Sequence, residues 1–213
     1  MNTEDVVIAK HVSALGVQDV YNDFWTSSEP QHITRYWSGK VAPVERHAEV
    51  RLCWSEEALL ARFLCNQHEA LIVSANPTTT AKTLGLWDRD VCELYLAPDC
   101  TNPNRYFEFE VAPTGEWLDL AIQMGVNGKQ TDWEFSSGMS VSAQMEDQKL
   151  IVSMSIPWSG SIPKPTAGDA WRVNFFRCVG PEESSRYLAW RPTFTRQPNF
   201  HVPVAFGWLR FAA

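Results

Sequence analysis

The stretch GLWDRDVCELYLAPD, residues 85–99, places an aromatic ring and a carboxylate close together in the sequence. Trp87 lies in a loop, and Glu93 follows six residues later within an apolar run that is typical of a strand. An indole at the mouth of a strand can stack on a flat ligand, and a carboxylate beside it can accept hydrogen bonds from that ligand. Two structural roles compete with this interpretation. Trp87 could close one end of a core, and Glu93 could face solvent or pair with Arg177.

A second set of carboxylates lies in RYFEFEVAP, residues 105–113. Side chains of a strand alternate between its two faces, so Tyr106, Glu108 and Glu110 are predicted to share one face, opposite the apolar residues. With Glu93, this polar row could bind the hydroxyls of a sugar. Alternatively, Glu93 paired with Glu108 or Glu110 could supply the two carboxyl groups of a glycoside hydrolase, which lie ~5–10 Å apart across a cleft.

Tryptophan is the compositional anomaly, with ten residues in a chain of 213. A flat indole covers the apolar C–H face of a sugar ring at little conformational cost, while carboxylates accept hydrogen bonds from the ring's hydroxyls. Trp54, Trp158 and Trp208 lie in or beside strand-like runs and are expected in the core. Trp87 differs because loop residues precede it and charged residues follow it.

The elements that position these residues are short strand-like runs, at 48–55, 58–67, 105–113, 116–122, 149–158, 170–179, 185–192 and 206–211. The first two also have helical propensity, but their alternation favours strands at least as strongly. Clusters rich in Pro and Gly separate the runs, as in NPTTT, PDCTNPN and RQPNFHVP. The pattern predicts an all-β fold, specifically a β-sandwich of two mainly antiparallel sheets, in a single domain spanning residues 1–213.

The charge balance excludes several classes of partner. A net charge of −7 and a pI near 5.2 argue against nucleic acid, whose phosphates attract basic surfaces. The sequence has no run of 18 apolar residues, so no membrane span is expected. The N-terminus lacks a basic segment followed by an apolar one, so no export signal is expected either. The oligomeric state and the compartment stay open.

The five cysteines are odd in number, and three of them lie within apolar runs, which favours buried thiols over a disulfide framework. A single bridge, for example between Cys92 and Cys100, is a second possibility. Local catalytic motifs such as GxSxG, HExxH, GxGxxG and the phosphate-binding P-loop are absent, and the five histidines are scattered. These absences favour a binding protein over an enzyme, although catalytic groups can also come from distant segments.

Several motifs together resemble the family 9 carbohydrate-binding modules: LWDRDVCELYLAPD, YFEFEVAPTGEW, WRVNFFR, AWRPTF, FHVP and FGWLRF. The resemblance spans about residues 35–211 and is most specific in the last forty residues. It implies a β-sandwich without catalytic activity, in which aromatic side chains clamp a sugar. Calcium, in a structural role, is also implied, and Asp88 and Asp90 are the candidate ligands because calcium prefers oxygen donors.

The resemblance also assigns individual residues. Trp87 and Glu93 match the family's tryptophan and the acid six positions later, and Trp190 is the best match for a second clamping aromatic, with Trp171 as its competitor. The family supplies arginine and asparagine from the next strand, where this chain has Tyr106, Glu108 and Glu110, and this departure leaves the sugar unspecified. We therefore expect a non-catalytic carbohydrate-binding protein. The alternatives are a glycan-active enzyme that uses the Glu pair, or a redox domain holding haem between Met and His side chains.

Overall fold

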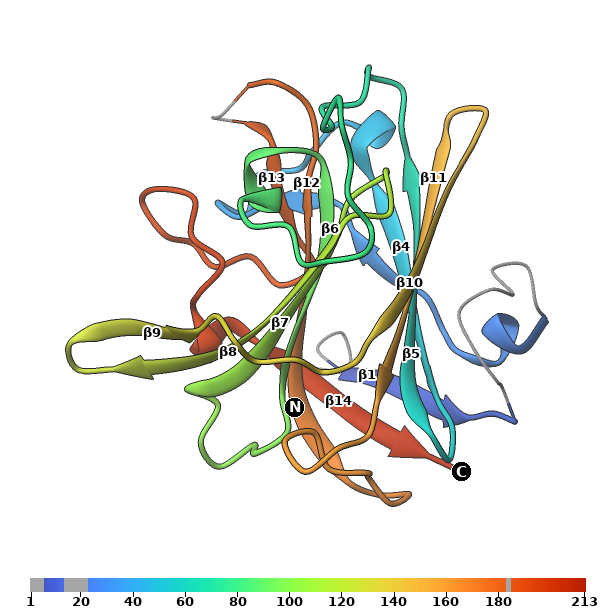
Figure 1. Cartoon of the computed structure of the whole chain (residues 1–213), viewed down its shortest axis with the longest axis vertical. Coiled ribbons are helices and arrows are strands. Elements are labelled where there is room, and N and C mark those ends of the chain that lie inside the picture. Colours follow the sequence, from blue (N-terminus) through green and yellow to red (C-terminus); the bar gives the residue numbers. More distant parts are fainter. Residues whose placement is uncertain (1–5, 14–22, 183–184) are drawn as a thin grey trace.

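The computed structural model describes residues 6–13, 23–182 and 185–213. Residues 1–5 and 14–22, which include part of the N-terminal stretch considered for an export signal, lie outside the described residues. Strands and short 3-10 helices make up the regular structure (Figure 1). Within the described ranges, no helix has the length and apolar character needed to cross a bilayer.

The first half of the chain contains these elements: β1 (Val6–His11), η2 (Asp23–Ser27), β2 (Gln31–Ile33), β3 (Arg35–Tyr36), η3 (Val44–Arg46), β4 (Ala48–Trp54), β5 (Ala58–Asn66), η4 (Leu86–Asp88) and β6 (Val91–Ala97). The second half contains β7 (Arg105–Val111), β8 (Trp117–Gly125), β9 (Gly128–Asp132), β10 (Ser140–Glu146), β11 (Lys149–Pro157), β12 (Ala170–Cys178), β13 (Tyr187–Ala189), η6 (Pro203–Ala205) and β14 (Gly207–Ala212). The all-β prediction is confirmed, and the segments 48–55 and 58–67 are strands.

The described strands form one hydrogen-bonded sheet in the order β10-β11-β5-β4-β1-β14-β12-β6-β7-β8-β9, with β2, β3 and β13 added at its margins. The prediction of two separate sheets is not confirmed. β1 pairs in parallel with both β14 and β4, and this strand joins the two halves into one curled, mixed sheet. In Figure 1 the half with β4, β5, β10 and β11 lies opposite the half with β6, β7, β8 and β12.

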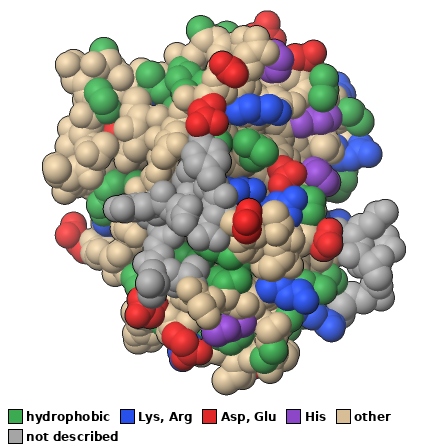
Figure 2. All heavy atoms as spheres, turned by 90° about the vertical axis from the view of Figure 1, so that its right-hand side faces the viewer, with side chains coloured by type: hydrophobic (Ala, Val, Ile, Leu, Met, Phe, Trp, Pro, Cys, Tyr) green, Lys and Arg blue, Asp and Glu red, His purple; other side chains and the backbone are tan. Residues whose placement is uncertain are grey.

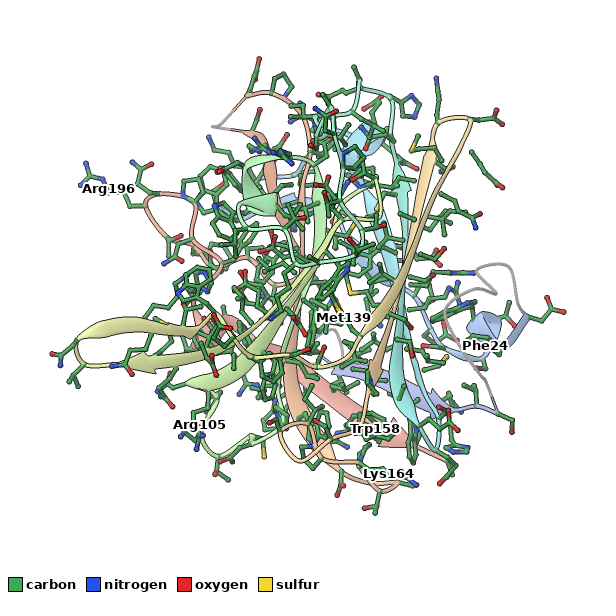
Figure 3. The ribbon with its side chains drawn as sticks, in the orientation of Figure 1. Phe24, Arg105, Met139, Trp158, Lys164 and Arg196 are labelled. Carbon is green, nitrogen blue, oxygen red and sulfur yellow. The ribbon has the colours of Figure 1, made fainter. Side chains whose placement is uncertain are left out.

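The main core fills the space between the two halves. Every second residue of β11, from Leu150 to Ile156, points into it, as the alternation of apolar residues and serines predicts. Met139, labelled in Figure 3, also belongs to this core. At one end, the rings of Trp158, Trp171 and Phe211 pack edge to face with centroids 4.7–6.4 Å apart.

The thiols are free, as the apolar surroundings of the cysteines predict. Cys92 does not pair with Cys100. Its sulfur instead lies 3.6 Å from that of Cys65, so the two thiols meet across the main core. Arg177 and Asn174 have the structural roles expected of buried polar residues. Arg177 donates to the carbonyl of Arg46 at 2.9 Å, and Asn174 donates to the carbonyl of Arg191 at 2.9 Å.

The two halves of the sheet differ in what covers their outer surfaces. On the half formed by β4, β5, β10 and β11, which faces the viewer in Figure 2, basic and acidic side chains are interspersed over the described surface. On the other half, a second apolar cluster covers the outer face of β6, β7, β8 and β12. Leu86 from η4, and Phe200 and Phe206 from the segment before β14, pack onto that face. Every residue of β6 is therefore buried, on both faces.

Candidate functional site

A cavity of about 330 Å³ opens on this covered outer face of β6, β7, β8 and β12. Its apolar and aromatic lining comes from Trp87, Tyr95, Leu120, Trp133, Tyr187, Pro198 and Phe200. Its polar lining comes from Glu93, Glu108, Lys129, Cys178, Asn199 and His201. In Figure 1 the β8–β9 hairpin and the loop after β13 both project on the left of the molecule, and both contribute to this lining.

The floor of the cavity is set by the register of β6 and β7. Glu93 lies directly opposite Glu110, and Tyr95 lies opposite Glu108. Because side chains alternate along each strand, all four point to the outer face, while the alternate residues Cys92, Leu94 and Leu96 point into the main core. The alternation in RYFEFEV thus predicts correctly which residues of β7 share a face.

These carboxylates are nevertheless almost completely buried, whereas solvent exposure was one of the roles considered for Glu93. Glu93 and Glu108 are 1% and 3% exposed, and Glu110 is 0% exposed. The reason is the cover of loops over this half of the sheet, which encloses a face that alternation alone would leave to solvent. Glu93 does not pair with Arg177 either, because Arg177 lies opposite Cys92 and shares the face of the main core.

The three carboxylates form one cluster. Each offers an oxygen within 4.8 Å of those of the other two. The hydroxyl of Tyr95 donates to Glu108 Oε1 at 3.0 Å, and the Cys178 thiol donates to Glu93 Oε1 at 3.5 Å. Glu108 Oε2 and both Glu110 oxygens are buried, and they have no hydrogen-bond partner outside the cluster among the described residues. Buried acceptors without donors are costly, so this cluster is a strained feature of the fold.

Burial and mutual repulsion change the acidity of these groups. Burial, followed by the charge of Glu108, raises the pKa of Glu93 to about 8. Burial and the charges of Glu93 and Glu108 hold the pKa of Glu110 well above its usual value. Burial also raises the pKa of Glu108. Desolvation penalises the charged form of a carboxyl, so near neutral pH the cluster retains protons unless a ligand or cation compensates its charge.

A basic and aromatic group adjoins the carboxylates, because the His201 ring stacks on Tyr95 with centroids 5.4 Å apart. His201 Nε2 lies 2.8 Å from the Lys129 ammonium, and His201 Nδ1 lies 2.8 Å from the Tyr106 hydroxyl. Burial and the charge of Lys129 lower the pKa of His201 to about 3, so the imidazole is neutral. An ammonium can only donate, so Nε2 is the acceptor, and Nδ1–H donates to Tyr106. Tyr106 therefore contributes by orienting His201, one layer below the cavity.

Two exposed indoles stand at the cavity. Trp87 is 37% exposed and Trp133 is 47% exposed, both unusually high for such large apolar side chains. Trp87 lies in η4, which begins after Gly85 in the left-handed conformation with φ of 77°. Trp133 follows β9 directly, in a turn held by Asp132, whose Oδ1 accepts the backbone N–H groups of residues 134 and 135. The arrangement presents two flat rings beside a polar floor.

The structure brings together only some of the residues predicted from the sequence. Trp87, Glu93 and Glu108 line the cavity, Glu110 completes the carboxylate cluster beneath it, and Tyr106 binds His201. Trp190 does not line the cavity. Its ring packs against Phe175 at 5.3 Å, on the side of the main core.

Lining residues that the sequence did not indicate include five from the β8–β9 hairpin, the residue after it and the loop after β13: Lys129, Trp133, Asn199, Phe200 and His201. The strands themselves add Tyr95, Leu120, Cys178 and Tyr187. The one local signal for the hairpin is an indole placed after the polar run GKQTD, where a core role is improbable. Phe200 stacks on Phe176 with centroids 4.0 Å apart, and this contact holds the loop onto the sheet.

The predicted calcium ligands Asp88 and Asp90 are used differently. Asp88 is exposed, whereas Asp90 is 1% exposed. Asp90 accepts the backbone N–H of Gly180 at 3.0 Å through Oδ1 and that of Ile72 at 3.3 Å through Oδ2. This carboxylate therefore joins two loops, and calcium binding at the pair stays a prediction.

Comparison with a family model gives a match over residues 35–211, and that model describes carbohydrate-binding family 9. A curated relative, called an extracellular protein, from Arthroderma benhamiae is 21% identical over 147 residues. The alignment covers 63% of this chain, and the chain spans about 64% of the length of that relative.

Three solved structures share the fold. A proposed carbohydrate-binding protein from Bacteroides uniformis superposes with a TM-score of 0.75 at 18% identity, covering 97% of this chain and 99% of that one. A family 9 carbohydrate-binding module from Caldicellulosiruptor kristjanssonii was solved with glucose and with cellotriose. These two structures superpose with a TM-score of 0.68 at 17% and 16% identity, covering 98% of this chain and 96% and 94% of theirs.

Proposed function

The chain belongs to carbohydrate-binding family 9, and we propose that it binds a glucose-type sugar in the cavity between Trp87, Trp133 and the carboxylate floor. Members of this family are non-catalytic binding modules, so Glu93 and Glu108 receive no role as an acid and base pair. The observation that carries the proposal is the placement of two exposed indoles at the same cavity as the buried carboxylates Glu93 and Glu108, of which Glu108 Oε2 has no donor among the described residues.

The aromatic side of the site suits the C–H face of a sugar ring. Trp87 and Trp133 expose enough of their rings to stack on a saccharide, and Tyr187 adds a third aromatic side chain to the lining. In this proposal Trp133 takes the clamping role that the family resemblance gave to Trp190, because Trp190 is engaged with Phe175. The clamp thus combines one residue before β6 with one after β9.

The polar side of the site suits the hydroxyls of the sugar. Carboxylate oxygens of Glu93 and Glu108 accept hydrogen bonds from hydroxyl groups, and each such bond also offsets the cost of burying an acceptor. Lys129 and Asn199, which also line the cavity, donate to ring or hydroxyl oxygens. A sugar hydroxyl is both donor and acceptor, so one ring can satisfy both kinds of group.

The size of the cavity and the ligands of the related structures narrow the sugar class. A cavity of about 330 Å³ lies at the lower end of the range for small-molecule sites, about 300–1,000 Å³, which favours one or two sugar rings over a long chain segment. The module from Caldicellulosiruptor kristjanssonii binds glucose and cellotriose. Glucose-type sugars with equatorial hydroxyls are therefore the first candidates.

Isothermal titration calorimetry with glucose, cellobiose and cellotriose, and with maltotriose and xylotriose for comparison, tests the proposal. Saturable binding of at least one glucose-type ligand is expected, with Kd values between the micromolar and millimolar ranges. The absence of binding across the whole panel, both with added calcium and with a chelator, would refute it.

A further inference from the structure

The carboxylate cluster beneath the cavity has a ligand requirement of its own. Glu93 and Glu108 line the cavity. Glu110 lies on β7 opposite Glu93 and does not line the cavity, and its side chain is fully buried. Three carboxylates within 4.8 Å of one another repel strongly when they are charged. Among the described residues, Lys129 is the one Lys or Arg side chain that lines the cavity, and its ammonium lies 2.8 Å from His201 Nε2.

Glu110 supplies a second and independent observation. Its side chain is 0% exposed, and neither of its oxygens has a hydrogen-bond partner outside the cluster among the described residues. Glu108 Oε2 is in the same state. The carboxyl of Glu108, two residues earlier on the same strand, can form a hydrogen bond with Glu110 only if one of the two carries a proton. A buried carboxylate aimed at two others therefore requires either a shared proton or a cation.

The geometry favours a cation of a particular size. When three ligand atoms lie within 4.8 Å of one another, a central point exists no farther than 4.8/√3, about 2.8 Å, from each of them. Calcium binds oxygens at about 2.3–2.6 Å, so a small inward adjustment of the side chains completes three bonds. Magnesium requires about 2.0–2.1 Å and an octahedral arrangement, which demands a larger contraction.

We propose that Glu93, Glu108 and Glu110 form a binding site for a calcium-sized divalent cation at the floor of the cavity. Glu110 anchors the ion from below, and Glu93 and Glu108 hold it from the cavity side. The open side of the ion faces the cavity, where water completes its coordination. If the cavity binds a sugar as proposed above, hydroxyls of that sugar replace some of this water, but the cation site exists without it.

The site differs from the Asp88 and Asp90 pair, which supplies one exposed carboxylate and one that is already engaged with backbone donors. The two locations are separable by substitution. Glu110→Gln keeps the shape of the side chain and removes one anionic ligand of the cluster. Asp88→Asn removes the exposed member of the alternative pair.

The test is calcium binding by the full chain without any sugar, after treatment with a chelator. Calorimetry gives Kd directly. Terbium luminescence gives a local readout, because the Tyr95 hydroxyl bonds to Glu108 and its ring can sensitise a bound ion. At a calcium concentration a hundredfold above Kd, the Tm of the native chain is expected to rise by about 5–10 °C.

The variants decide the location. Glu110→Gln is expected to weaken calcium at least tenfold and to abolish the Tm shift, and Glu108→Gln provides a second variant with the same expectation. Asp88→Asn and the distant exposed control Glu146→Gln are expected to change Kd by less than twofold. Absence of calcium binding by the native chain, or loss of binding in Asp88→Asn but not in the Glu variants, would overturn the proposal. Because no sugar is present, these outcomes are independent of those that test carbohydrate binding.

Discussion

Replacing Trp87 with alanine measures how much the exposed indole contributes to sugar binding. A tryptophan side chain presents up to about 250 Å², and the 37% of Trp87 that is exposed amounts to about 90 Å² available to a ligand. Burying that area at about 25 cal/mol per Å² contributes about 2 kcal/mol, which corresponds to a loss of about 30-fold in affinity. The remaining part of the ring already packs on the protein, so the variant also loses some stability.

The assay is titration calorimetry with cellotriose, or with the tightest ligand of the panel, on the native chain and the variant. Trp208→Ala is the matched control, because Trp208 is also partly exposed but stacks under Arg172 and does not line the cavity. Circular dichroism and urea denaturation verify that both variants are folded. An affinity within threefold of the native value in folded Trp87→Ala, or an equal loss in Trp208→Ala, would refute the stacking argument.

Three further changes test the rest of the structure. Trp190→Ala is expected to lower the free energy of unfolding in urea by about 2–4 kcal/mol, because the Trp190 ring packs on Phe175. Sugar affinity is expected to stay within twofold of the native value, and a large loss of affinity in the folded variant would show that Trp190 belongs to the site. Lys82→Met is expected to lower the free energy of unfolding by about 2–4 kcal/mol, because the buried Asp119 then loses the ammonium that lies 2.7 Å from its carboxylate. A change below about 1 kcal/mol would contradict this expectation. In the presence of a chelator, the free energy of unfolding is expected to fall as pH rises, because burial raises the pKa of Glu93 from 4.5 to about 8 in the folded protein. The stabilisation from protonated Glu93 is complete below pH 4.5 and is lost as the pH rises through about 8. Urea midpoints that stay flat or rise between pH 5 and 9 would contradict the shift.

Local patterns in the sequence predicted most of the longer strands and the faces of their side chains, but strands β1, β2, β3, β9 and β10 were not predicted. The alternation in RYFEFEV identified Glu108 and Glu110 as neighbours on one face, and the structure places both in the carboxylate cluster. The run KLIVSMSIPW, residues 149–158, predicted β11 and its inward apolar residues. These features depend on side-chain periodicity, which one segment determines alone.

Features that depend on distant partners were not predictable in this way. β1 joins the halves of the sheet by pairing with β14, about two hundred residues away in the chain, and no local pattern encodes that parallel contact. The burial of Glu93 likewise depends on a cover that includes Phe200, which stacks on Phe176. Trp133 reaches the cavity because a hairpin projects there, whereas Trp190, which the family resemblance indicated, packs on Phe175.

The central claim is that the sugar lies against Trp87 and Trp133. The ten tryptophans give ten indole N–H signals in an NMR spectrum of the isotope-labelled protein, and single Trp→Phe variants assign them. Titration with cellotriose is predicted to shift the signals of Trp87 and Trp133 most strongly and to leave that of Trp190 nearly unchanged. Shifts concentrated at Trp190, or the absence of any change at Trp87 and Trp133 under saturating sugar, would contradict the proposed site.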